Sequence, residues 1–167
     1  MKVYFSHGKE SGPWGSKIRA LADVARDLGC AVASVDYTQE PDPDQRVKQL
    51  LELLKRERDD YVLVGSSMGG YVSLIAAAMA PAKGVFLLAP ALYLPGYMRQ
   101  DYPTETDRIE IVHGWSDSVI PPENSIKFAR HADCTLHLLR GGHRLKSSLG
   151  EVGAIFSRFL ASVAVFR

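Results

Sequence analysis

Apolar runs and segments of helical periodicity alternate along the whole chain. Six runs rich in β-branched and apolar residues predict strands at residues 2–6, 30–36, 61–65, 84–90, 108–114 and 135–141. Between the first four runs, apolar residues spaced by three or four positions predict helix faces, formed by Ile18, Leu21, Ala22, Ala25 and Leu28, by Val47, Leu50, Leu51 and Leu54, and by Val72, Ile75, Ala76 and Met79. This alternation predicts an α/β fold in which helices cover both faces of a parallel sheet.

Two more helices and one irregular segment complete the pattern. Helices are predicted from "PPENSIKFARHA", which begins at Pro121, and from residues 147–163 near the C-terminal end. The second helix is expected to begin near Asp42 or Asp44, either of which can cap it. Residues 90–107 have no clean periodicity and predict a loop, which is too short for a cap domain.

Composition narrows the class of protein. A chain of 167 residues is expected to form a single domain over residues 1–167. With 20 Lys and Arg against 19 Asp and Glu and no basic stripe, nucleic-acid binding is not expected. No apolar run reaches about 18 residues and no signal-like segment opens the sequence, so neither membrane insertion nor export is expected. Cys30 and Cys134 match no metal-ligand spacing and favour a reducing, cytoplasmic setting as small buried hydrophobic residues.

The segment "VLVGSSMGGYVSL" raises the question of reactivity. Gly65 and Gly69 stand two residues on either side of Ser67, after an apolar strand and before a helix. One interpretation is a tight turn that only connects two core elements. The other is a nucleophile elbow, in which glycines remove the collisions that a strained turn would otherwise cause. The strand and helix on either side favour the elbow, with the Met68 N–H able to stabilise an oxyanion near the start of the helix.

A serine nucleophile needs a base, and histidine is the suitable side chain near neutral pH. In a parallel sheet, ligands bind beyond the carboxyl ends of the strands, so loops after strands are the places to search. Only His143 combines a loop after the last predicted strand with flanking glycines, Gly141 and Gly142. His7 and His113 end strands and are expected to orient loops through hydrogen bonds, whereas His131 ends a helix and His137 lies within a strand.

A carboxylate should orient the imidazole. Asp117 follows the fifth predicted strand by a few residues, whereas Asp107 precedes that strand and Asp101 lies in the irregular segment. Asp117 could also be an ordinary turn aspartate in "WSDS". The chain order Ser67, Asp117, His143 is that of α/β hydrolases rather than that of chymotrypsin-like or subtilisin-like proteases.

The loop after the first strand is the candidate source of a second oxyanion donor. Lys9 follows the His7-Gly8 pair, and its backbone N–H is placed in the right neighbourhood, with Gly8 allowing close approach. A glycine-rich connection without that role is the alternative. Because this loop lacks both nucleotide-binding glycine patterns and no metal-ligand cluster is visible, no cofactor and no metal are expected.

Taken together and in this order, "HG" at 7–8, "GSSMGG" at 65–70, "HGWSDSVIP" at 113–121 and "GGH" at 141–143 resemble the α/β-hydrolase superfamily over the whole chain. Within it, the sequence is most similar to the small, lidless bacterial esterases of the YqiA type. The resemblance implies a three-layer α/β/α sandwich, a six-stranded sheet of local order 2-1-3-4-5-6 and an open site without a cap. It departs at Lys9-Glu10, which stand where relatives frequently have apolar residues.

The expected function is that of a serine carboxylesterase with a Ser67, His143 and Asp117 triad and an oxyanion hole from Met68 and Lys9. Its substrate would be a small acyl ester, cleaved through an acyl-enzyme intermediate. Two alternatives remain open at this point. The same triad could act on thioesters or peptides, or the fold could serve as a non-catalytic interaction module.

Overall fold

The computed structural model describes residues 1–102, 106 and 108–165, and it contains one six-stranded parallel sheet. The strands are β1 (Lys2–Ser6), β2 (Ala31–Val35), β3 (Tyr61–Ser66), β4 (Gly84–Leu88), β5 (Ile109–Gly114) and β6 (Thr135–Leu139). They lie in the order β2-β1-β3-β4-β5-β6, with every neighbouring pair parallel. The predicted fold class and strand order are therefore confirmed.

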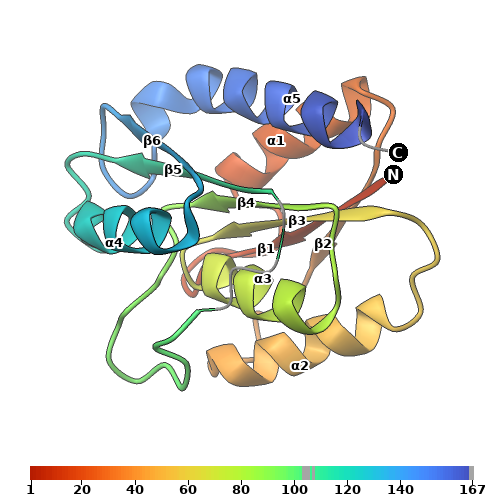
Figure 1. The fold of residues 1–167 in the computed structure, drawn as a ribbon, viewed down its shortest axis with the longest axis horizontal. Helices are drawn as coiled ribbons and strands as arrows, with labels where there is room; N and C mark the ends of the chain where they lie inside the picture. The colour runs from red at the N-terminus through yellow and green to blue at the C-terminus, as the bar shows by residue number, and fades with distance from the viewer. Residues whose placement is uncertain (103–105, 107, 166–167) are drawn as a thin grey trace.

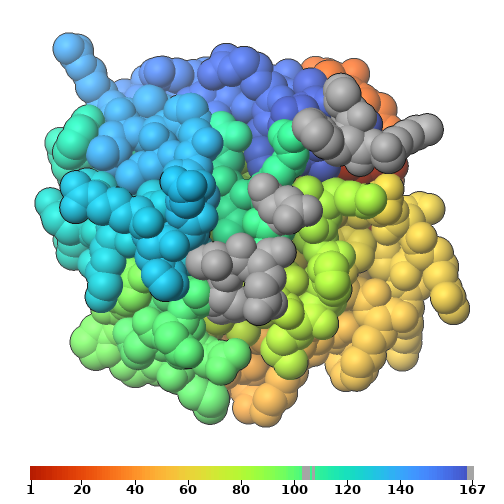
Figure 2. Space-filling view, in the orientation of Figure 1, coloured from red at the N-terminus to blue at the C-terminus, as the bar shows by residue number. Residues whose placement is uncertain are grey.

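Helices form a layer on each face of the sheet (Figure 1). They are α1 (Ser16–Asp27), α2 (Pro43–Leu54), α3 (Met68–Met79), α4 (Pro122–Ala132) and α5 (Leu149–Val165), with a short 3-10 turn η1 (Lys146–Ser148) before α5. Helices α1 and α5 cover one face, and α2, α3 and α4 cover the other. In the space-filling view the two layers close over the sheet, with α5 along the upper edge and α2 along the lower edge (Figure 2).

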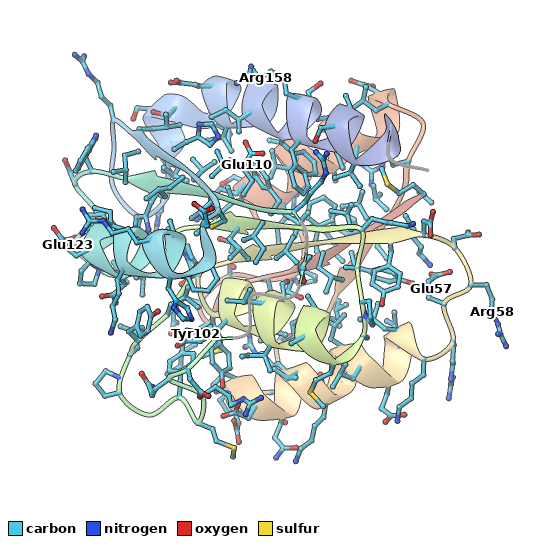
Figure 3. All side chains as sticks on the ribbon, in the orientation of Figure 1. Glu57, Arg58, Tyr102, Glu110, Glu123 and Arg158 are labelled. Carbon is cyan, nitrogen blue, oxygen red and sulfur yellow. The ribbon has the colours of Figure 1, made fainter. Side chains whose placement is uncertain are left out.

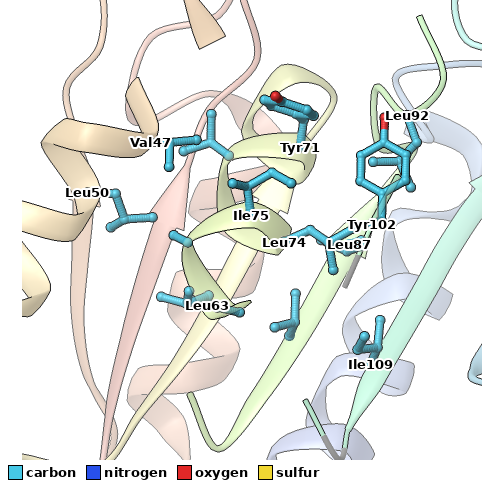
Figure 4. Packing of buried hydrophobic residues seen from close by; sticks show 14 of the residues in the cluster. Val47, Leu50, Leu63, Tyr71, Leu74, Ile75, Leu87, Leu92, Tyr102 and Ile109 are labelled. Carbon is cyan, nitrogen blue, oxygen red and sulfur yellow. The ribbon is translucent and has the colours of Figure 1, made fainter. Parts of the chain in front are cut away.

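Alternating side chains of the strands divide the core into two clusters. In β3, Val62 and Val64 belong to the cluster under α1 and α5, whereas Leu63 belongs to the cluster under α2 and α3. Figure 4 shows the second cluster, where Val47 and Leu50 of α2 meet the inner face of α3. Because the central strands are covered on both faces, their sequences are apolar throughout rather than alternating.

The connection from β4 to β5 contains no helix among its described residues, as the sequence predicts. The predicted loop at 90–107 is described except at residues 103–105 and 107. Its Tyr102 is buried between α3 and α4, where its ring meets the rings of Tyr71 and Phe128 (Figure 3). In its described part, this connection therefore adds no helical cap over the sheet.

The residues predicted to begin α2, β2 and β6 lie at the starts of these elements in the structure. Asp42 caps α2, and its side chain accepts a hydrogen bond from the Asp44 N–H at 2.8 Å. Cys30 and Cys134 directly precede β2 and β6, and both are free thiols. Each is partly rather than fully buried, and the two pack against opposite faces of the sheet. Their position on edge strands, which helices cover less completely, explains this exposure.

Candidate active site

Ser67 lies at the turn between β3 and α3 in a strained backbone conformation. Its φ of 56° and ψ of −119° are uncommon for a residue with a side chain. The turn is held by two backbone hydrogen bonds of 2.9 Å to the end of β4, from the Ser67 N–H to the Leu88 carbonyl and from the Ala91 N–H to the Ser67 carbonyl. A Cβ at Gly65 would overlap the Gly69 backbone, and one at Gly69 would overlap the Ser6 backbone. Both glycines are therefore required by close backbone approach.

The three residues predicted for the triad meet in one hydrogen-bond chain. His143 Nε2 lies 3.0 Å from Ser67 Oγ, and His143 Nδ1 lies 2.7 Å from Asp117 Oδ2. Because an ionised Asp117 can only accept, His143 Nδ1–H donates to it, and Nε2 is left to accept from the Ser67 hydroxyl. In the sequence, Asp117 lies 26 residues and Ser67 lies 76 residues before His143. The structure thus brings together a carboxylate, a hydroxyl and an imidazole from distant parts of the chain.

Glycines let the loops after β5 and β6 approach each other. Gly141 has a φ of 119°, which favours glycine, and it directs the chain back toward β5. A Cβ at Gly114 would overlap the Gly141 backbone, so the two loops touch at that point. The Ser116 N–H then donates to the Gly141 carbonyl at 3.0 Å, which ties the Asp117 turn to the His143 loop.

Asp117 is buried and fully hydrogen-bonded. Its Oδ1 accepts from the backbone N–H groups of Val119 and Ile120 at 2.8 and 2.9 Å, and its Oδ2 accepts from His143. Burial alone would raise the pKa of Asp117, but the hydrogen bonds from Ile120, His143 and Val119 together lower it below its usual value. The carboxylate is therefore held ionised at neutral pH.

A second histidine, His113, lies beneath Asp117 and is completely buried. Its Nε2 lies 3.0 Å from both Asp117 Oδ2 and the Ile120 carbonyl oxygen. Since both partners accept, Nε2 carries the proton and donates to them. His113 Nδ1 then accepts from the Ser125 hydroxyl at 2.7 Å. Burial lowers the pKa of His113, so the ring is neutral.

The sequence assigned His113 to loop orientation and missed its contact with Asp117. The available signal was weak, because a histidine four residues before an aspartate at a strand end has many other uses. The contact depends on the turn from Trp115 to Ile120, which folds the carboxylate back over the end of β5.

Replacing His113 by phenylalanine is expected to lower the free energy of unfolding by about 1–3 kcal/mol, because the Ile120 carbonyl and the Ser125 hydroxyl lose a buried partner. Urea denaturation measures this change. His131→Phe is the matched control, since His131 is exposed at the end of α4. A His113→Phe variant as stable as the wild type would contradict the role of this hydrogen-bond network.

The same variant predicts a pH effect. Because burial lowers the pKa of His113, the unfolded chain takes up a proton below the ordinary histidine pKa of about 6.5, and the folded chain does not. Wild-type stability is therefore expected to fall as the pH falls from about 6.5 to 5. Denaturation midpoints over this range should fall less steeply for His113→Phe, and equal slopes would contradict a neutral buried ring.

A cavity of about 580 Å³ opens beside Ser67 and His143. It is lined by the loop after β1, the start of α1, the elbow and the segment after His143. A Cβ at Gly8 would lie 3.3 Å from Ser67 Cβ, so the loop that holds Lys9 runs close to the elbow. Met68 is the first residue of α3, where a backbone N–H has no intrahelical partner. Both predicted oxyanion donors thus belong to segments that border the nucleophile.

The other predicted histidines stand apart from this hydrogen-bond chain. His7 is buried; its Nδ1–H donates to the Gly8 carbonyl at 2.7 Å and its Nε2 accepts from the Tyr37 N–H at 2.9 Å, so it orients the loop after β1 as expected. His137, in the middle of β6, pairs with Glu110 at 2.6 Å. Within residues 1–102, 106 and 108–165, no group of three or more His, Cys, Asp or Glu could hold a metal ion. Of the helices in the described part of the chain, none combines the length and apolar character needed to cross a bilayer.

Comparison with known proteins gives the family. Residues 1–113 match an uncharacterised protein family, UPF0227. The chain belongs to UPF0227. A protein from Xanthomonas campestris pv. campestris assigned to the α/β-hydrolase superfamily is 31% identical, with 96% of this chain and 98% of that chain covered and a TM-score of 0.89. Comparison with curated proteins finds no match.

More distant structures share the fold of this UPF0227 chain. Est1E from Butyrivibrio proteoclasticus is 20% identical, with 98% of this chain and 88% of that chain covered and a TM-score of 0.81. A serine α/β hydrolase without a lid from Xanthomonas campestris is 19% identical, with 96% and 81% covered and a TM-score of 0.72. The UPF0227 chain is thus an α/β-hydrolase-type protein without a lid, as the sequence resemblance implied.

Proposed function

We propose that this protein is a serine carboxylesterase that hydrolyses small acyl esters. The observation that carries the proposal is the hydrogen-bond chain from Ser67 through His143 to Asp117, with distances of 3.0 and 2.7 Å. A serine hydroxyl is a poor nucleophile by itself, and an imidazole in this arrangement can take its proton during attack. The strained elbow exposes that hydroxyl at the edge of a cavity.

In the first half of the reaction, Ser67 Oγ attacks the ester carbonyl while His143 Nε2 takes the hydroxyl proton. The carbonyl oxygen becomes an oxyanion, for which the N–H groups of Met68 and Lys9 are the proposed donors. His143 then gives its proton to the leaving alcohol as the ester C–O bond breaks, which leaves an acyl group on Ser67. The positive charge on His143 is stabilised by the ionised Asp117.

In the second half, water replaces the alcohol. His143 takes a proton from water, the resulting hydroxide attacks the acyl carbon, and the proton returns to Ser67 Oγ as the acid leaves. His113 and the Val119 and Ile120 N–H groups hold Asp117 in place during both halves. Every proton transfer in this scheme uses a side chain of the protein or a water molecule, so the reaction needs no cofactor.

A ligand of one relative with the same fold is consistent with a small acyl substrate. Ferulic acid, a carboxylic acid, is bound to Est1E in a structure 19% identical to this chain. The cavity of about 580 Å³ beside Ser67 lies within the usual size range for small-molecule sites. Thioesters and peptides offer a carbonyl for the same attack, so matched ester, thioester and aminopeptide substrates with one acyl group will separate these alternatives.

A fluorophosphonate probe tests whether Ser67 is reactive. We expect stoichiometric labelling of the folded protein, with the modified residue mapped to Ser67 by mass spectrometry. Among the described serines, Ser67 alone is hydrogen-bonded to a histidine and also borders the cavity. Protein unfolded in urea should not be labelled. Folded protein that stays unlabelled would contradict the proposal and favour a non-catalytic interaction module.

A further inference from the structure

The cavity beside Ser67 is rich in basic side chains. Its lining includes the cationic residues Lys9, Lys17, Arg144 and Lys146 and a single acidic residue, Glu10. The chain as a whole is nearly neutral, with a net charge of +1, so this local excess of cations does not reflect overall composition. A cavity with low-dielectric walls concentrates such a field and attracts ligands of the opposite charge.

No ion pair joins these cations to a carboxylate of the described residues. Among the described residues, no carboxylate lies within 4.0 Å of the charged nitrogens of these four side chains. Elsewhere on the surface, lysines such as Lys2, Lys55 and Lys83 do pair with carboxylates at 3.1, 2.5 and 3.5 Å. In the described part of the chain, the positive charge of the cavity therefore exceeds the negative charge of Glu10 and is not neutralised by direct ion pairs.

Lys17 occupies the key position among them. It is partly buried at the start of α1, and its Nζ donates to the His143 carbonyl oxygen at 3.0 Å. An ammonium group can donate three hydrogen bonds, and only this one is made to the described residues. Burial lowers the pKa of Lys17 to about 8, while nearby Asp117 raises it and Arg144 lowers it. An anion in the cavity would stabilise the charged ammonium that burial disfavours.

The N-terminal end of α1 also makes the electrostatic potential of the cavity more positive. Gly15, which precedes the helix, supplies no side-chain cap, and the first turn contains no acidic residue. Gly15, Ser16 and Ile18 line the cavity together with Lys17, so the positive end of the helix dipole faces it. The dipole adds to the side-chain charges and does not define the site alone.

We propose that the substrate of this esterase carries a carboxylate or phosphate group, which Lys17 binds within the cavity next to Ser67. This inference rests on the proposed esterase function and specifies its substrate class. Lys9, Arg144 and Lys146 steer the anion toward the cavity, and Lys17 supplies the direct contact. The charged residues Lys9 and Glu10, which line the cavity, fit a site that selects polar acyl esters over fatty ones.

Two esters of the same length test the proposal. The mono-4-nitrophenyl ester of adipic acid carries a terminal carboxylate, and 4-nitrophenyl hexanoate ends in a methyl group. The wild type is expected to have a higher kcat/KM for the adipate ester, after subtraction of spontaneous hydrolysis. In Lys17→Met the ratio of the two values should fall about ten- to a hundredfold, the range expected when a charged hydrogen bond is lost. The change should appear mainly in KM for the adipate ester.

Control variants separate this role from a structural one. Lys48→Met changes an exposed lysine on α2, away from the cavity, and should leave the ratio unchanged. Lys17→Arg keeps the charge and should retain much of the preference. If Lys17→Met slows both esters equally, Lys17 only supports the His143 loop through the carbonyl contact, and the proposal is wrong.

The pH dependence of the ratio of the two kcat/KM values tests the role of Lys17 in the wild-type protein. As the pH rises through about 8, Lys17 loses its charge, and the wild-type preference for the adipate ester should decline. The ratio cancels any effect of pH on the chemical step that the two esters share. Glu10, Lys9, Arg144 and Lys146 face the same cavity, and Asp117 lies nearby, so the decline should disappear in Lys17→Met if Lys17 is the titrating group. A decline that persists in this variant would assign the effect to another group.

The anion could belong to the alcohol instead of the acyl group. The esters 3-carboxy-4-nitrophenyl butanoate and 4-nitrophenyl butanoate differ only by a carboxylate on the leaving phenol. A Lys17-dependent preference for the anionic member of either pair supports the proposal and assigns the side of the scissile bond. Absence of that preference in both pairs overturns it.

Binding distinguishes failure of this inference from failure of the esterase function. In a Ser67→Ala background, calorimetry should show tighter binding of the adipate ester than of the hexanoate ester, and Ser67→Ala/Lys17→Met should lose the difference. If the wild type hydrolyses neither ester but this difference is found, anion recognition stands and the reaction is another one. If hydrolysis is found without the difference in rate or binding, the esterase proposal stands and the anion proposal fails.

Discussion

Replacing Ser67 by alanine is expected to lower kcat/KM for 4-nitrophenyl butanoate by about a thousandfold or more. The variant keeps the cavity, the loop of His143 and the proposed oxyanion donors but lacks the hydroxyl proposed to attack the carbonyl. Its stability should equal or exceed that of the wild type, since it loses one hydroxyl from a partly exposed site. Turnover is measured from released 4-nitrophenol, and folding is measured by circular dichroism and urea denaturation.

The matched control for this variant is Ser73→Ala in α3. The Ser73 hydroxyl is buried and has no hydrogen-bond partner among the described residues, so its removal should change neither turnover nor fold, and a small gain in stability is expected. Undiminished turnover in Ser67→Ala, in protein purified free of contaminating esterases, would rule out the proposed nucleophile.

Replacing Gly69 by alanine is expected to have the largest effect on folding. Replacing a glycine inside a helix by alanine usually stabilises the helix. Here the added Cβ would overlap the carbonyl group of Ser6 and approach that of His7, so α3 and the end of β1 must move apart. Such overpacking against backbone is expected to cost roughly 3 kcal/mol or more, a large part of the stability of a domain. Urea denaturation and the yield of folded protein are the measurements.

For Gly153→Ala in α5, the same substitution is expected to have the opposite effect on stability. Its Cβ would have its nearest neighbour, Val24 Cγ2, at 3.7 Å, which is ordinary contact. The variant should be as stable as the wild type or more stable by about 0.5–1 kcal/mol. If Gly69→Ala proved as stable as Gly153→Ala, the close approach of α3 to β1 would be wrong.

The elbow was predictable because its pattern is local in the sequence. The backbone of Gly69 and Gly70 requires Gly65, and the end of β1 requires Gly69, but the glycines, the apolar run before them and the helix after them are all visible in the sequence. The positions of Asp117 and His143 at the same edge followed from a general rule for parallel sheets. That rule places loops near one another but does not say which atoms touch.

Contacts between loops could not be predicted from the sequence. His113 accepts from Ser125 and donates to Asp117 because the turn at residues 115–120 folds back on β5. Lys17 reaches the His143 carbonyl from a helix 126 residues away in sequence. Neither residue belongs to a spacing pattern, since its partners come from elements that only the packed sheet brings together.

The sequence by itself determined the six strands, the helices between them, the strained turn at Ser67 and the set of residues able to form a triad. Periodicity and the glycines around Ser67 suffice to predict these features because both are patterns that can be read along the chain. Only the tertiary structure decided that His143 hydrogen-bonds both Ser67 and Asp117, that His113 is buried beneath the carboxylate, and that Lys17 lines the cavity. Hydrogen bonds depend on distances of a few tenths of an ångström, which are set by the packing of the whole sheet and its helices.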